Sequence, residues 1–89
     1  SHGPGRVAFE GVWTRARYVL LTRILREVPV SWRFYVKHEL FRALEGRTAG
    51  ADGGTAELLA AYGDLAARFE DLPPAAAFGR EAAVRAAAE

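Results

Sequence analysis

The sequence predicts an all-α fold, a three-helix bundle followed by a weak C-terminal helical tail. Apolar residues recur at spacings of three and four through most of the chain, which is the period of an amphipathic helix. No stretch alternates like a strand, and no internal repeat is present. Prolines and glycines separate the periodic segments. We therefore expect a disordered lead-in at residues 1–5, a three-helix domain at 6–72 and an Ala-rich helix or tail at 73–89.

The first helix is predicted from Val7 to the residue before Pro29. A proline disfavours helical geometry at the preceding residue and has no N–H to donate, so it ends the helix. With all its large apolar side chains counted, the apolar arc spans about 200°, against about 100° for an ordinary surface helix. This width predicts more than one packing face. The residues that set the period are Phe9, Trp13, Ala16, Leu20 and Ile24.

Arg17 lies in the middle of this apolar arc, between Trp13 and Leu21. An arginine in such a position usually extends its guanidinium to solvent or meets a buried acid. The alternative is that it faces a polar ligand or a partner inserted between the helices.

The second helix is predicted to begin with Ser31 as its N-cap and to run to Leu44 or Glu45. Gly46 follows at the position that favours a left-handed C-terminal turn. Because the connection to the first helix is short, the two helices should pack antiparallel as a hairpin.

Residues 46–54 contain three glycines and no large apolar side chain, which predicts a mobile loop. Thr55 is predicted to cap a third helix, and Pro73 and Pro74 are predicted to end it. The residues that repeat along this helix are Leu58, Tyr62, Leu65 and Phe69.

A fourth, weaker helix is predicted from Ala75 to Glu89 on alanine propensity. Phe78 and Val84 give it little apolar surface to bury. We expect this segment to lie on a partner or to fray.

Composition argues against an enzyme. The chain has 89 residues, no cysteine and two histidines, so thiolate chemistry, disulfides and an all-histidine metal site are excluded. His38 and Glu39 are adjacent and point about 100° apart on a helix, so they cannot act on one face. No apolar run reaches the length of a membrane span. We therefore expect no catalytic residue, no metal site, no directly bound cofactor and no transmembrane segment.

The net charge of +1 hides an asymmetry between the two halves of the chain. Residues 1–47 carry nine basic and four acidic side chains, and residues 48–89 carry three and seven. This division suggests that the first half faces an acidic partner. The alternative is an ordinary solvated face of a bundle. Nucleic acid is a less favoured partner, because Trp13 and Trp32 lie at helical core spacing rather than in an exposed stacking row.

Three segments resemble a known family. Residues 20–29 (LLTRILREVP), residues 35–42 (YVKHELFR), and residues 57–59 with Gly63 and Leu65 occur in the order found in the LYR, or complex I LYR-like, family of short mitochondrial helical proteins. The resemblance extends to the LYR accessory subunit of respiratory complex I and to the succinate dehydrogenase assembly factor. In the signature itself Leu20 matches, while Leu21 and Thr22 stand where the family has Tyr and Arg.

The resemblance implies an LYR-type bundle that binds the mitochondrial acyl carrier protein. The carrier contributes its acyl-4'-phosphopantetheine, whose chain enters between the helices. The chain would then be an accessory subunit or assembly factor of a respiratory-chain complex, with NADH dehydrogenase (complex I) expected first. It would act in electron transport in the mitochondrial matrix or on the matrix face of the inner membrane.

The same resemblance assigns candidate residues. Those expected to contact the acidic carrier are Arg15, Arg23, Arg26, Arg33 and Lys37. Those expected to line the acyl chain are Leu20, Ile24, Phe34, Phe41, Leu58 and Tyr62. Two alternatives stay open: a structural subunit of a large mitochondrial assembly that has lost carrier binding, and a ribosome- or nucleic-acid-associated helical protein.

Overall fold

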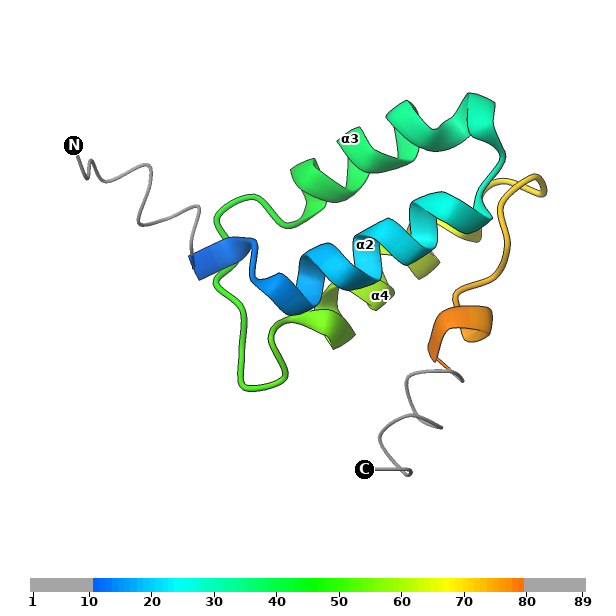
Figure 1. Cartoon of the computed structure of the whole chain (residues 1–89). Helices are drawn as coiled ribbons and strands as arrows, with labels where there is room; N and C mark the ends of the chain where they lie inside the picture. The colour runs from blue at the N-terminus through cyan, green and yellow to red at the C-terminus, as the bar shows by residue number, and fades with distance from the viewer. Residues whose placement is uncertain (1–10, 80–89) are drawn as a thin grey trace.

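The computed structural model describes residues 11–79, and these residues are helical with no strand. Three α-helices and one 3₁₀ turn make up the fold: α2 (Arg15–Glu27), η1 (Val30–Trp32), α3 (Arg33–Ala43) and α4 (Thr55–Ala66). Each of the three α-helices contacts the other two. Figure 1 shows α2 and α3 side by side as an antiparallel hairpin, with α4 behind α2. The all-α prediction is confirmed for the described part of the chain.

The core lies where the three helices meet. Apolar side chains from all three have essentially no exposed surface, and two aromatic groups extend the core toward its ends. The Trp13 ring packs 4.4 Å from that of Phe41, and the Trp32 ring packs 4.9 Å from that of Phe69. The most deeply buried apolar residues are Ile24, Val36, Leu40, Leu44, Leu58 and Tyr62.

The first helix is shorter than predicted. Within the described residues the helix is interrupted at Trp13 and Thr14, and α2 begins at Arg15. Thr14 has an extended backbone, and its hydroxyl accepts a hydrogen bond from the Arg17 N–H at 3.1 Å, which is N-cap geometry. The predicted stop is correct, because Val28 is extended immediately before Pro29. The predicted start at Val7 lies outside the described residues.

The second helix begins differently from the prediction. Ser31 is not an N-cap but the middle residue of η1, and α3 begins at Arg33 without a side-chain cap. Pro29 fixes the backbone one residue before η1, so the chain enters α3 through a tight turn. Gly46 has φ of +73°, as predicted for a left-handed turn after the helix.

The third helix is capped by a residue that the sequence did not single out. Thr55 is the first residue of α4, and the preceding Gly54 is left-handed with φ of +81°. The Asp52 carboxylate accepts hydrogen bonds from the N–H groups of Gly54 at 2.8 Å and Ala56 at 3.0 Å. Asp52 therefore accepts from two N–H groups at the start of α4 and takes the capping role that was predicted for Thr55.

The end of the third helix also differs from the prediction. α4 ends at Ala66, well before Pro73. The chain then turns back, because Phe69 packs on Trp32 and the Tyr62 hydroxyl donates a 2.6 Å hydrogen bond to the carbonyl of Pro73. These contacts join residues that are more than ten positions apart in the sequence. The local spacing of apolar residues therefore could not predict where α4 ends.

The start of the C-terminal segment packs on the chain itself. Residues 76–79 form a helical turn, and Phe78 is buried with its ring perpendicular to that of Tyr62 at 5.4 Å. The expectation that this segment lies on a partner is therefore wrong for Phe78. Val84 and the rest of the predicted fourth helix, like the predicted lead-in at 1–5, lie outside the described residues.

No helix within residues 11–79 is long and apolar enough to cross a membrane. The same part of the chain contains no group of three His, Asp or Glu side chains arranged to hold a metal ion.

Candidate docking surface

The predicted charge-contact residues lie on the outside of the α2–α3 hairpin. Arg15 and Arg26 of α2 are exposed, as is Thr22, which lies between them on the same side of the helix. Arg33 and Lys37 of α3 are also exposed, and they are one helical turn apart. Arg23 is half-buried and is thus less available to a partner.

Two of these cations make contacts within the hairpin. The Arg33 Nε donates a 2.7 Å hydrogen bond to the carbonyl of Leu25, in the last turn of α2. That carbonyl has no partner within the helix, so Arg33 joins the start of α3 to the end of α2. The Lys37 ammonium lies 6.0 Å from the centroid of the Phe41 ring, at the outer limit of a cation–π contact.

Large apolar side chains are exposed beside these cations. Phe34 is 85% exposed and Val30 is 72% exposed, and the two are four residues apart in the continuous turn that leads from η1 into α3. Burial of such side chains is normally favourable by about 1.5–3 kcal/mol each. Because both side chains are left in solvent, we interpret this end of the hairpin as a surface that binds a partner.

The predicted acyl-chain wall is not one continuous surface. Ile24, Leu58 and Tyr62 meet in the core with no exposed surface. Leu20 and Phe41 are half-buried at its edge, and Phe34 points to solvent. The six residues therefore separate into three closed core residues, two half-buried residues and one exposed side chain. An acyl chain could reach the core set only if the helices moved apart.

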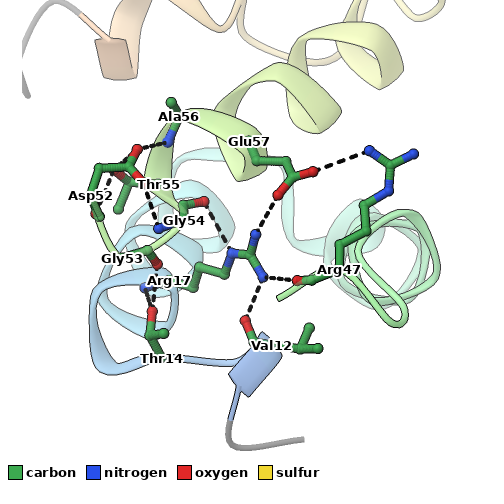
Figure 2. Close-up of polar contacts among 10 residues, drawn as sticks. All are labelled: Val12, Thr14, Arg17, Arg47, Asp52, Gly53, Gly54, Thr55, Ala56 and Glu57. Carbon is green, nitrogen blue, oxygen red and sulfur yellow. Dashed lines mark hydrogen bonds and ion pairs between the residues drawn. The ribbon is translucent and has the colours of Figure 1, made fainter. Parts of the chain in front are cut away.

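Arg17 is the centre of a polar cluster that joins α2 to the loop before α4 (Figure 2). Its side chain is fully buried, and Nε donates to the carbonyl of Gly54 at 3.0 Å. Nη1 donates to the carbonyls of Val12 and Arg47, the second at 2.9 Å. Nη2 forms an ion pair with the Glu57 carboxylate at 2.8 Å. The sequence predicted either an extension to solvent or a contact with a buried acid: the first is wrong because Arg17 is fully buried, and the second is confirmed for the contact, although the acid, Glu57, is 37% exposed.

Glu57 lies between two arginines. Its second oxygen accepts from Arg47 Nη1 at 3.1 Å, so this one carboxylate joins the buried Arg17 to the exposed Arg47. Arg17 has four acceptors from its own chain, three backbone carbonyls and the Glu57 carboxylate, and its side chain is fully buried. We interpret this cluster as structural.

The loop at residues 46–54 is anchored by this cluster rather than free. The Ala49 N–H donates to the carbonyl of Gly11 at 2.9 Å, and the Thr14 hydroxyl donates to that of Gly53 at 2.6 Å. Hydrogen bonds from the Ala56 and Gly54 amides lower the pKa of Asp52 below its ordinary value of 3.8. The sequence contained one usable signal for this arrangement, an Asp–Gly–Gly–Thr run directly before a helical period.

A shallow hollow of about 260 Å³ lies between α3 and α4, and the sequence did not indicate it. None of the predicted site residues lines it. Ala43, Ala60 and Ala61 are among the residues that line it, and charges of both signs surround it, including Glu39, Asp64 and Arg68. Mixed charges give the hollow no clear ligand preference.

No protein-family model, curated protein or solved structure matches this chain. A functional argument therefore depends on the residues and their geometry. The two groups with the clearest geometry are the Arg17 cluster and the exposed cations of the hairpin.

Proposed function

We propose that this chain is a non-enzymatic adaptor that binds an acidic helical partner through the outer surface of the α2–α3 hairpin. In the form that the sequence resemblance suggests, the partner is the mitochondrial acyl carrier protein. The bundle is then of the LYR type, and the adaptor is an accessory subunit or assembly factor of a respiratory-chain complex. One observation carries the proposal: four cations on the hairpin are exposed while the fifth candidate is half-buried.

The arrangement of the cations supports an extended contact with carboxylates. Arg15 and Arg26 lie on one side of α2, and Arg33 and Lys37 lie along α3. Guanidinium groups form bidentate hydrogen bonds with carboxylates, which makes arginine suited to an acidic partner. Arg33 is already positioned by its bond to the carbonyl of Leu25, so less side-chain entropy is lost on binding.

The core supports a role for an acyl chain only if binding opens it. Ile24, Leu58 and Tyr62 are fully buried in the free chain, so an inserted acyl group would have to replace contacts among them. A ligand that binds the folded chain and not the unfolded one raises stability by mass action. An acylated carrier should therefore raise the melting temperature of the complex more than the same carrier without an acyl group.

The proposal is tested by co-expressing the chain with the carrier and measuring the complex by native mass spectrometry and calorimetry. Arg26→Gln and Arg33→Gln should each weaken binding about two- to fivefold, the usual effect of one exposed interfacial charge. Arg42→Gln is the matched control, because Arg42 is an exposed α3 arginine outside the candidate set. Recovery of only the free chain would contradict the proposal, as would equal binding by all three variants.

A second test looks for a variant that binds the carrier more tightly. Such a gain of binding cannot result from unfolding of the variant. Thr22 is exposed between Arg15 and Arg26, at the position where the LYR signature has arginine. Thr22→Arg should tighten carrier binding by adding a cation to this row. Leu21→Tyr is a poor test, because Leu21 is buried and a tyrosine ring would overpack the core. Binding that appears only with Thr22→Arg would favour a structural subunit that has lost the carrier.

A further inference from the structure

The end of the α2–α3 hairpin carries an exposed apolar pair, Val30 and Phe34, that lies outside the core. We define the hairpin tip as Val30, Arg33, Phe34 and Lys37, on η1 and the first half of α3. We infer that the hairpin tip binds the surface of an anionic phospholipid bilayer, with Phe34 and Val30 inserted at the boundary between headgroups and acyl chains. This inference goes beyond the proposed function.

Exposure and shape favour a bilayer as the occupant. Phe34 and Val30 are 85% and 72% exposed, so they project from the end of the hairpin. Neither lines the hollow between α3 and α4. A projecting apolar side chain needs a partner with a matching cavity if that partner is a folded protein. A lipid surface accepts it without a preformed cavity.

Charge at the tip is complementary to an anionic headgroup layer. Arg33 and Lys37 flank Phe34 along the chain, and no acidic residue occurs between Glu27 and Glu39. Basic residues beside an inserted apolar group attract anionic lipids, and salt screens this attraction. The same basic residues would have little effect on a neutral bilayer.

Aromatic rings behind the tip fit the same environment. Trp32 is half-buried and Tyr35 is 41% exposed, and both pack on Phe69 with ring centroids 4.9 and 5.9 Å from it. Tryptophan and tyrosine are enriched where apolar and aqueous phases meet, because one end of each ring is apolar and the other polar. Trp32 therefore provides a reporter close to the inserted pair, whereas Trp13 is buried.

The test uses the full chain without any carrier, so it can fail independently of the proposed function. Flotation is measured with phosphatidylcholine vesicles and with vesicles in which about a quarter of the lipid is phosphatidylserine. Binding is expected to the anionic vesicles only, to fall as salt rises, and to shift the fluorescence of Trp32 to shorter wavelength.

Variants locate the contact. Phe34→Ala should weaken vesicle binding by about tenfold or more, as expected for removing one inserted aromatic side chain. Val19→Ala is the matched control, since Val19 is 54% exposed on α2 and lies outside the hairpin tip. Far-UV circular dichroism should be the same for all three proteins, because neither substitution touches the core.

Four outcomes would overturn the inference: no binding to anionic vesicles at low salt, equal binding to neutral vesicles, equal loss of binding by Phe34→Ala and Val19→Ala, or wild-type vesicle binding by Phe34→Ala. If Phe34→Ala leaves vesicle binding unchanged but abolishes capture of the acidic carrier, the tip is part of a protein interface instead.

Discussion

Arg15 and Arg17 are two residues apart on α2, but they differ in burial and in their partners. Arg17 is fully buried, and its guanidinium contacts three backbone carbonyls and the Glu57 carboxylate. Arg15 is exposed on the outer side of the same helix. Two residues on a helix correspond to about 200° of rotation, which carries one side chain to the junction with the loop before α4 and the other to solvent.

The same contrast separates two regions, the Arg17 cluster and the hairpin surface. In the Arg17 cluster, every charged side chain has partners within the chain. These contacts stabilise the loop at residues 46–54 and the start of α4. On the hairpin surface the exposed cations lie beside exposed apolar side chains, and removing one breaks exposed contacts such as the hydrogen bond from Arg33 to the carbonyl of Leu25. Charges that are not needed for folding are the ones available for binding.

The largest effect should come from Arg17→Met. The substitution removes one of two donors to Glu57 and one of two donors to the carbonyl of Gly54. It also removes the Arg17 donor from the carbonyls of Val12 and Arg47. An unsatisfied buried acceptor costs about 1–3 kcal/mol, so the total loss should be about 3–5 kcal/mol. Arg15→Gln is the comparison, with a change within about 0.5 kcal/mol. Urea unfolding followed by circular dichroism measures both.

Arg17→Met could be too unstable to purify, so a milder variant accompanies it. Glu57→Gln keeps the shape of the side chain and removes the charge that faces Arg17. It should lose less stability than Arg17→Met and more than Arg15→Gln. Equal stability of all three variants would show that the cluster does not hold the fold together.

A second, smaller effect on stability is expected where the backbone of Gly54 lies close to the guanidinium of Arg17. Gly46 and Gly54 both have positive φ, so alanine at either position is strained by about 1–2 kcal/mol. A Cβ at Gly46 would meet nothing within 4 Å, whereas one at Gly54 would lie 2.2 Å from Arg17 Nε. Gly54→Ala should therefore cost about 1–3 kcal/mol more than Gly46→Ala, the cost of overpacking. Equal losses would mean that Arg17 can move aside without penalty.

The sequence predicted the parts of this fold that depend on local periodicity. The helical class, the stop before Pro29 and the left-handed Gly46 follow from neighbouring residues, and each is confirmed. The position of Arg17 in an apolar arc also predicted either an extension to solvent or a contact with an acid, and the contact with an acid is what the structure has. Which acid could not be predicted, because Glu57 is forty residues away and only the packing of α2 on α4 brings the two together.

The errors have two physical causes. The end of α4 at Ala66 and the burial of Phe78 depend on contacts with residues more than ten positions away. The cap by Asp52 is instead a local contact with Gly54 and Ala56, for which the Asp–Gly–Gly–Thr run was a usable signal. At the candidate docking surface, residues that the sequence analysis placed in one set differ in how exposed they are. Phe34 and Phe41 are seven residues apart on one side of α3, yet Phe41 packs on Trp13 and Phe34 remains in solvent.

A third effect should appear at high pH. Burial raises the pKa of Tyr62 from 10.0 to about 12. Between these values the unfolded chain loses the phenolic proton while the folded chain keeps it, so the unfolded state binds fewer protons. The free energy of unfolding should be independent of Tyr62 ionisation below pH 10 and should fall as the pH rises through 12.

Tyr62→Phe separates this effect from the titration of other groups. The variant loses the hydrogen bond to the carbonyl of Pro73, at a cost of about 1 kcal/mol near neutral pH, and its stability should fall less steeply above pH 10. Tyr35→Phe is the control, because Tyr35 is 41% exposed, and it should fall like the wild type. Equal slopes in all three proteins would show that Tyr62 ionises as freely in the folded chain as in the unfolded one.

The smallest effect on folding is expected at the hairpin surface, from Phe34→Ala. An 85% exposed ring contributes little burial, and alanine has the higher helix propensity, so the free energy of unfolding should change by less than about 0.5 kcal/mol. Phe78→Ala removes the same side chain from a buried site and should cost about 3–5 kcal/mol. Urea unfolding of both variants compares one residue type in the two settings. A large loss of stability with Phe34→Ala would mean that the Phe34 ring helps to hold the bundle together. Its exposure would then no longer be an argument that the hairpin surface serves binding rather than folding.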